Sequence, residues 1–183
     1  MINPNNQFGL SSDTNYLSTL MDQLVVNWLN EKQKRFFLDY VNIEEGYKQF
    51  GVIGLSDYSY FITPAFKGLE GTLIQIAEEL GFDLKKYDFK IGVIFNEENL
   101  EKFYNDVIDK IENLSSQNKE DIQLWLNDAR RILRHFRHSP AHFMGENKPT
   151  WDKAFLFGDH IMSIVNNLCL VLIEAKIIGN PKD

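Results

Sequence analysis

The sequence predicts an all-α protein, a bundle of about five or six helices with little or no sheet. Most of the chain carries apolar residues at helical spacing, and residues that cap helices stand ahead of several of these stretches. Only two short segments have the glycines and alternating apolar residues of extended chain. These three observations leave room for one or two short extended pieces beside the helices.

Residues 13–180 are expected to form a single domain, because 183 residues with 44% hydrophobic content suffice for one full core. Residues 1–12 are polar and are expected to be disordered. They lack a basic stretch followed by an apolar segment, so we predict no signal peptide and a cytoplasmic location. The only cysteine, Cys169, lies in an apolar run and is expected to be a core residue.

The N-terminal part, residues 13–50, is expected to be a pair of helices. Apolar residues follow helical spacing from Leu17 to Leu29, which predicts one continuous helix there. A second helix is expected from about Lys32 to Tyr47, ahead of a glycine at position 51.

The remaining residues, 51–178, are expected to form a bundle that carries the functional residues. Its first segment, GVIGLSDYSYFI at 51–62, allows a short extended piece. Thr63 and Pro64 then supply an N-cap and a first-turn proline for a helix that stops at Gly81.

Three further segments follow along the chain. Residues 89–95 form the second candidate extended piece. Asn96 is expected to cap a helix over 97–114, and Ser116 to begin the helix that leads into a cluster of arginines.

The last and longest helix is expected from 151 to about 178, capped by Thr150. Its segment from Ile161 to Ile178 approaches the length of a membrane span. It also contains two asparagines and two charged residues, Asn166, Asn167, Glu174 and Lys176. This segment is too polar for a lipid span, so we expect a buried helix and no membrane association.

The most informative segment is RRILRHFRHSPAH, residues 130–142. Four of the chain's five arginines and three of its four histidines lie in it, namely Arg130, Arg131, Arg134, Arg137, His135, His138 and His142. The chain as a whole has a net charge of −7, so this cluster opposes the global charge. It predicts a local anion site, for which the natural anion is a phosphate.

Pro140 decides how this segment folds. A continuous helix would place Arg137 and His142 about 140° apart around the axis. Pro140 has no N–H and would clash with the preceding turn, so the helix should end near Ser139. Ser139 and Pro140 then look like the N-cap and first turn of a new helical piece, and this kink allows Arg137 and His142 to act together.

This pair has the chemistry for RNA cleavage. An arginine can stabilise the extra charge of a pentacovalent phosphorane. A histidine with a pKa near neutrality can take the proton of a ribose 2′-OH or give one to the leaving 5′-oxygen. Because the substrate carries its own nucleophile, no metal or cofactor is required. We interpret Arg137 and His142 as catalytic, with His138 beside them.

Four neighbouring residues are the candidate substrate-binding residues: Arg130, Arg131, Arg134 and Ser139. For the three arginines and His135, the alternative is a solvated helix face paired with carboxylates, and we favour that alternative.

A metal site is the weaker interpretation of the histidines. His138 and His142 stand at i and i+4, but Pro140 disrupts the helix that this spacing requires. No HExxH glutamate lies between them. No metal ligands are therefore predicted.

Glu70 is the third candidate catalytic residue. Its neighbours at i−4, i+3, i+4 and i+7 are all apolar, namely Phe66, Leu73, Ile74 and Ala77. A carboxylate on such a face is either partnered or raised in pKa. Gly68 and Gly71 beside it would allow another backbone to approach closely. The alternative is a structural glutamate at the edge of the core that bonds an arginine.

The segment RHSPAH, Arg137 to His142, resembles the R-polar-x(3)-H signature of HEPN-domain ribonucleases, which are compact all-α bundles. Its surroundings add specificity: TPAFKGLEG upstream, a helical spacer, and a long apolar terminal helix preceded by a tryptophan. This order, over about residues 50 to 178, is similar to the HEPN region of the RNase LS toxin family, the RnlA-like toxins. The larger toxins of that family carry additional N-terminal domains.

The resemblance implies a metal-independent endoribonuclease of a toxin–antitoxin or phage-defence system. It implies a homodimer in which two motifs share one composite cleft, an RNA substrate, and neutralisation by a protein antitoxin. An acidic residue upstream of the motif joins the arginine and histidine in that family, and its match here is Glu70.

Two interpretations from other classes stay open. One is a catalytically inert HEPN module that binds RNA or a nucleotide, or docks a partner protein. The other is a helical interaction protein whose arginine cluster recognises an acidic protein surface. The acidic global charge argues against tight nonspecific RNA binding but leaves room for a focused cleft.

Overall fold

The computed structural model describes residues 14–50, 59–82, 97–109, 115–138 and 151–179. Its helices in chain order are α1 (Thr14–Leu17), α2 (Gln23–Trp28), α3 (Glu31–Phe50), the 3-10 helix η1 (Ser59–Ile62), α4 (Thr63–Glu79), α6 (Glu97–Asp109), α7 (Ser116–His138) and α8 (Trp151–Glu174). These ranges contain no strand, which confirms the all-α class. The candidate extended piece at 89–95 lies outside the described residues, as do residues 51–58 of the other one. Residues 59–62 are helical, so that expectation was wrong for them.

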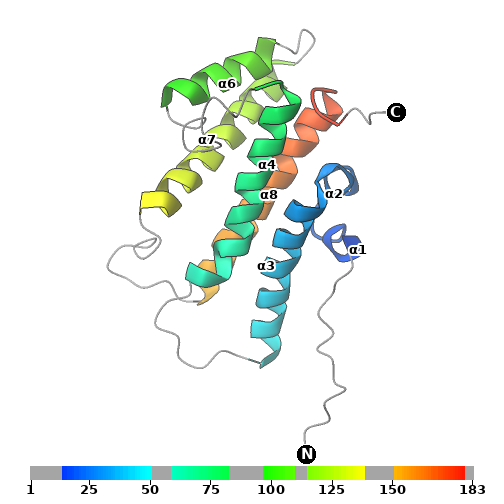
Figure 1. Ribbon diagram of the computed structural model, residues 1–183, viewed down its shortest axis with the longest axis vertical. Coiled ribbons are helices and arrows are strands. Elements are labelled where there is room, and N and C mark those ends of the chain that lie inside the picture. The colour runs from blue at the N-terminus through cyan, green and yellow to red at the C-terminus, as the bar shows by residue number, and fades with distance from the viewer. Residues whose placement is uncertain (1–13, 51–58, 83–96, 110–114, 139–150, 180–183) are drawn as a thin grey trace, which may run out of the picture.

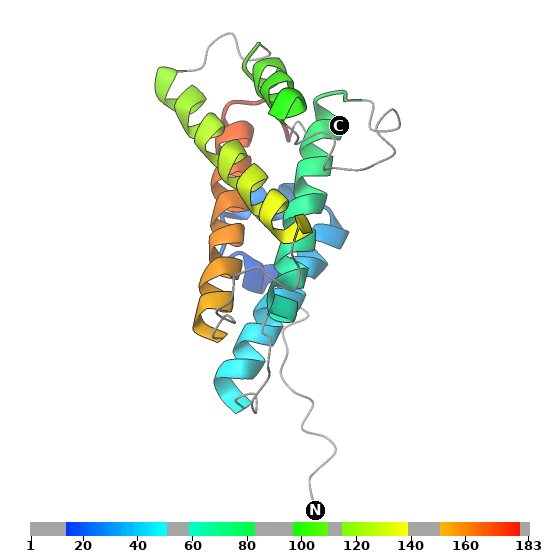
Figure 2. The same cartoon turned by 90° about the vertical axis from the view of Figure 1, so that its left-hand side faces the viewer.

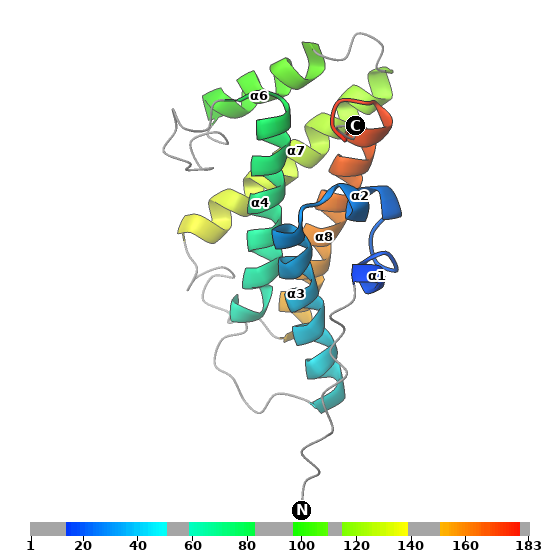
Figure 3. The ribbon, with the colours of Figure 1, turned by 45° about the vertical axis from the view of Figure 1, so that its right-hand side comes forward.

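The helices form three layers (Figure 1). The pair α4 and α8 is the middle layer, α1, α2 and α3 cover one side of it, and α7 covers the other side. Helices α4 and α8 pack against each other and run in the same direction, while α3 and α7 run in the opposite direction. Figure 2 shows α7 in front of the central pair, and Figure 3 shows α1, α2 and α3 on the other side of it. Helix α6 crosses one end of the bundle, where the rings of Phe82 and Phe103 lie 5.1 Å apart. The bundle therefore has an α7 face and an opposite α1–α3 face.

The N-terminal segment forms two short helices rather than the single one that its periodicity predicts. The helix is interrupted at Asp22, which is the N-cap of α2. Its side chain accepts a hydrogen bond from the N–H of Leu24. Its own N–H donates to Oδ1 of Asn166 on α8 at 2.6 Å, which holds the break against the core. Leu20 and Leu24, which fit the helical period, are left about half exposed. The second helix of the pair, α3, begins after an Asn30 cap and confirms the expectation.

Glycines set the close packing of α3 on α4. A Cβ added to Gly68 would lie 2.5 Å from the ring of Phe37, and one added to Gly71 would lie 2.7 Å from Nε2 of Gln33. Both values are below a real van der Waals contact, so a side chain at position 68 would clash with the rigid Phe37 ring, and one at position 71 would displace the end of Gln33. Side chains of α3, rather than its backbone as the sequence suggested, fill the space. Gln33 is 5% exposed there.

Helix α4 starts one residue earlier than the capping pattern predicts. Ile62 occupies the N-cap position without a side-chain hydrogen bond, so Thr63 is already helical and Pro64 lies in the first turn. Ile62 is fully buried, and its packing takes the place of a polar cap. The end of the helix agrees with the prediction, because Gly81 follows it with a φ of +80°.

Phe155 of α8 joins three elements in one aromatic cluster. Its ring lies 5.6 Å from that of Tyr47 on α3 and 5.9 Å from that of Phe61 in η1. The ring of Tyr40 is 6.2 Å away, and the Tyr40 hydroxyl donates to the carbonyl of Phe155. This cluster fixes the first half of α8 against the α3 layer.

Helix α8 is the core helix that the sequence predicts. Its buried apolar residues include Ile161, Ile164, Val165, Leu168 and Leu172. The helix ends at Glu174, four residues before the predicted end, because Lys176 turns to a φ of +58° and the Ile177 N–H bonds back to Leu172. Among the described residues, its 152–174 stretch alone has the length and composition of a membrane span, with mean hydropathy 1.6. Core helices of globular proteins meet the same criteria, so this finding is weak.

Cys169 lies in this core with no exposed surface. Burial raises the pKa of its thiol far above the ordinary range, and the Glu79 carboxylate raises it further. The expectation of a core cysteine is confirmed.

Candidate functional site

Helix α7 carries the arginine cluster and is anchored by an apolar stripe. The stripe consists of Ile122, Leu126, Ala129, Ile132 and Leu133, all buried. These residues recur at the spacing of one helical face, so they fix the rotation of α7 against α4 and α8. The helix begins where predicted, at Ser116, although Ser115 is the capping residue, with its hydroxyl oxygen 3.2 Å from the Asn118 N–H. Its described residues run to His138, and the expected stop near Ser139 lies at the edge of the described residues.

The first two arginines of the cluster differ in their surroundings. Arg130 is half-buried and has a polar or electrostatic partner. Arg131 is 67% exposed, and its guanidinium lies 3.9 Å from the carboxylate of Asp128. The environment of Arg131 is thus that of a solvated helix face, which was the favoured interpretation for this residue.

The other residues of the motif lie at or beyond the end of the described helix. Arg134, Arg137 and His138 belong to the last two turns of α7, of which the structure describes the helical backbone. Ser139 and His142 lie outside the described residues. Whether Arg137 and His142 come together therefore stays a prediction.

Glu70 lies on α4, the helix that contacts α7. It is half-buried, and its predicted apolar neighbours Phe66, Leu73 and Ala77 are indeed buried. Glu70 interacts with at least one other residue, so its carboxylate is not isolated on this face. It is the eighth of 17 residues of α4 and so stands at the middle of the helix.

The end of α7 lies level with the middle of α4. The two helices are in contact, and Figures 1 and 2 show the C-terminal end of α7 at the height of the middle of α4. Arg137 and His138 belong to the last turn of α7, and Glu70 belongs to the middle of α4. No group of three or more His, Cys, Asp or Glu side chains that could hold a metal ion occurs in the part of the chain that the structure describes.

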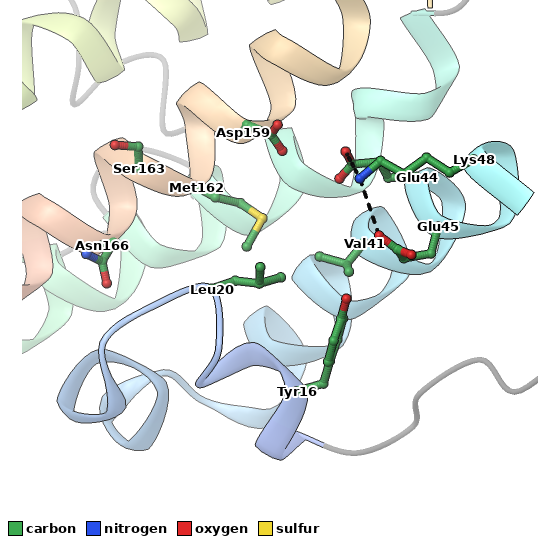
Figure 4. A pocket seen from close by; sticks show the side chains of 10 residues that line it. All are labelled: Tyr16, Leu20, Val41, Glu44, Glu45, Lys48, Asp159, Met162, Ser163 and Asn166. Atoms are coloured by element: carbon green, nitrogen blue, oxygen red, sulfur yellow. Dashed lines mark hydrogen bonds and ion pairs between the residues drawn. The ribbon is translucent and has the colours of Figure 1, made fainter. Parts of the chain in front are cut away.

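A second site, which the sequence did not suggest, lies on the α1–α3 face. It is a hollow of about 370 Å³ between α3, α8 and the turn after α1 (Figure 4). Glu44, Glu45 and Lys48 border it from α3, and Asp159 borders it from α8. Because these residues come from segments more than 100 positions apart, no local pattern marks them. The only local signal in the sequence is the acidic pair Glu44-Glu45, which is also typical of a solvated helix face.

Tyr40 lies behind this hollow and is fully buried. Its hydroxyl is 2.8 Å from the Phe155 carbonyl and 2.9 Å from Oδ1 of Asp159. Burial raises the pKa of Tyr40 far above its ordinary value, and the carboxylates of Asp159 and Glu44 raise it further. The hydroxyl therefore stays protonated and ties Asp159 to the α3–α8 contact.

The all-α bundle and its arginine-bearing helix agree with the comparison to protein families. The family described as "RNase LS, bacterial toxin DBD domain" matches residues 14–144, and the chain belongs to this family. No curated protein and no solved structure matches the chain significantly. The family match corrects the expected extent of the resemblance, because it begins at α1 rather than near residue 50. It contains Glu70 and the whole RHSPAH segment, and it ends before α8.

Proposed function

We propose that this protein is a metal-independent endoribonuclease toxin whose active site contains Arg137, His142 and Glu70, with His138 beside them. Membership in the RNase LS toxin family supports the toxin class. The observation that supports the site is that α7 contacts α4 and its C-terminal end lies level with the middle of α4. This arrangement supports a joint role for Glu70 and Arg137, although the two residues lie 67 positions apart in the sequence.

The helical spacing of α7 supports a phosphate-binding flank. Positions 130, 134 and 137 stand at i, i+4 and i+7, which places them on one side of a helix. Arg130 is the one residue of this set whose side-chain burial the structure describes, and it is half-buried. Arg131, on another side of the helix, is exposed. We therefore propose Arg130 and Arg134 as substrate-binding residues, and assign Arg131 a weaker, screened contribution. Ser139 completes the proposed set because it lies within the RHSPAH motif, between Arg137 and His142.

The proposed reaction is transesterification within the RNA. The ribose 2′-oxygen loses its proton to a general base and forms a bond to the adjacent phosphorus. The bond from phosphorus to the 5′-oxygen breaks, and that oxygen receives a proton from a general acid. The products are a 2′,3′-cyclic phosphate and a 5′-hydroxyl. His142 exchanges one of these protons, and Arg137 stabilises the charge of the phosphorane. Glu70 is proposed to orient the arginine or the histidine as a carboxylate partner.

Two partners belong to the same proposal. Toxins of this class are held inactive by an antitoxin, and we propose a protein antitoxin for this chain. We also propose a two-fold homodimer in which two motifs share one cleft, as the HEPN resemblance implies.

The experiment is cleavage of structured and unstructured RNA by the purified protein in EDTA, with end-group analysis of the products. We expect cleavage that persists in EDTA and leaves 2′,3′-cyclic phosphate or 3′-phosphate ends. Strict dependence on Mg²⁺ would contradict the mechanism. RNA binding without any cleavage would favour the inert binding module instead.

A further inference from the structure

The hollow between α3 and α8 has a negative wall. Its border includes three carboxylates, Glu44, Glu45 and Asp159, and one cation, Lys48. Nζ of Lys48 lies 2.8 Å from Glu44 and 3.3 Å from Glu45, and the hydrogen bond to Glu44 is the main reason that the pKa of Lys48 lies above its ordinary value. One ammonium thus offsets one of three carboxylates, and the hollow keeps an excess of negative charge. A cationic occupant is favoured and a phosphate is repelled.

The remaining border of the hollow is mixed, with three apolar side chains beside the polar groups of Tyr16, Ser163 and Asn166. Leu20 extends from the turn after α1, Val41 from α3 and Met162 from α8, and Figure 4 shows these three side chains reaching into the space between the elements. Apolar side chains next to carboxylates fit a side chain with a hydrocarbon stem and a charged end. Arginine matches best, because its planar guanidinium can bond two carboxylate oxygens at once.

The surface around the opening favours a protein as the source of that side chain. Leu20, on the border, is 49% exposed. A free organic cation would leave much of this leucine in water, whereas a polypeptide would cover it. Central arginine anchors surrounded by apolar contacts are typical of protein interfaces.

We propose that this hollow is a docking site for an arginine side chain of a partner protein. The site lies on the α1–α3 face, and α7 lies on the other side of the central α4–α8 pair. A partner docked here leaves the arginine helix open to RNA. The proposal does not depend on ribonuclease activity, because it uses none of the proposed catalytic residues.

The test uses three probes on ¹⁵N-labelled full-length protein, followed by NMR titration. The first is the peptide acetyl-Ala-Leu-Arg-Leu-Ala-amide, the second is the same peptide with citrulline in place of arginine, and the third is spermidine. We expect the arginine peptide to shift amides of residues that border the hollow, such as Val41 and Met162, with a Kd of about 1 mM. The citrulline peptide should bind at least about tenfold more weakly, because it lacks the charge.

A pair of matched variants locates the effect. Glu45→Gln removes a carboxylate from the border, where its side chain is 40% exposed, and should weaken the arginine peptide about threefold. Glu31→Gln removes the same charge from the same helix at an 85% exposed site outside the hollow, and should change nothing. Equal binding of both peptides, an unchanged Kd in Glu45→Gln, shifts confined to α7, or no binding at 10 mM would each overturn the proposal. Spermidine binding as tightly as the peptide would overturn the assignment to a protein partner.

Discussion

Arg137 and His142 are the two residues on which the ribonuclease proposal depends. The family match covers both of them, and the described part of α7 extends through Arg137 to His138. Pro140 predicts a helix end near this point, because a proline inside a helix removes a backbone hydrogen bond and its ring clashes with the preceding turn. The same reasoning cannot supply the distance between the two side chains, since that depends on a segment outside the described residues.

Substitution of these two residues tests the site directly. Arg137→Ala and His142→Ala should each abolish RNA cleavage, while circular dichroism and the melting temperature stay nearly unchanged. Arg137→Lys should restore little, because an ammonium cannot reproduce the bidentate fork. Arg131→Ala is the control, since Arg131 is exposed and paired with Asp128, and it should keep most of the activity. Full activity in both alanine variants would place the site elsewhere.

Tyr40 allows a test of the α3–α8 contact at a single hydroxyl. Tyr40→Phe keeps the ring in the core and removes only the group that bonds Phe155 and Asp159. We expect a loss of about 1–2 kcal/mol in the free energy of unfolding, measured by urea denaturation. Tyr104→Phe is the matched control, because its hydroxyl lies 3.4 Å from the Lys119 carbonyl and contributes little.

The stability of the wild-type protein and that of Tyr40→Phe should respond differently to alkaline pH. The pKa of Tyr40 is raised in the folded chain above its ordinary value of 10.0, so below pH 10 both states keep the proton and stability is unaffected. Above pH 10 the unfolded chain releases it and the folded chain does not, which favours unfolding by up to about 1.4 kcal/mol per pH unit. The stability advantage of wild type over Tyr40→Phe should therefore shrink between pH 10 and 11. A constant difference would show that the hydroxyl is not held as described.

The helices show which features of the fold can be predicted from sequence. Periodicity and Gly81 predict α3 and α4, because both signals are local. The break between α1 and α2 could not be predicted, since it depends on Asp22 bonding to Asn166, which lies 144 positions away. Similarly, the hollow on the α1–α3 face arises only when α3 and α8 are placed side by side. The arginine cluster of α7 is visible in the sequence because its residues lie close together in the chain. The hollow is not visible there, because its residues come from both α3 and α8.

Helix packing gives a prediction that contrasts two glycines. A Cβ added to Gly158 of α8 would lie 2.3 Å from the ring of Tyr40, so Gly158→Ala should destabilise the protein by about 1–3 kcal/mol. Gly46 on α3 has no atom within 4 Å of an added Cβ, so Gly46→Ala should stabilise it by about 0.5–1 kcal/mol through helix propensity. Urea denaturation of both variants measures the contrast. Effects of the same sign would contradict the described contact of α3 with α8.

Across the whole molecule, the two faces of the bundle differ in chemistry. The α7 face carries the arginine cluster of an otherwise acidic chain, whereas the opposite face holds a hollow with excess carboxylates. If the proposed RNA site and the proposed arginine-docking site are both correct, their separation on two faces lets the protein bind RNA and a basic partner without competition.

The homodimer is the remaining prediction for the whole molecule. Helix α8 is apolar over most of its circumference, and Leu170, Val171 and Ile173 in its second half stay only partly buried, while Leu156 in its first half is 69% exposed. Such residual apolar surface favours burial in a second copy. We expect light scattering to give the mass of a dimer at micromolar concentration.

Mixing inactive chains tests whether that dimer shares its sites. If Arg137 of one chain acts with His142 of the other, an equal mixture of Arg137→Ala and His142→Ala chains forms heterodimers with one intact site. Random pairing would then recover about a quarter of wild-type cleavage. Each variant alone should stay inactive, which serves as the control. A monomer that cleaves RNA at the normal rate would refute the composite site, whereas a stable dimer without ribonuclease activity would favour an inert binding module.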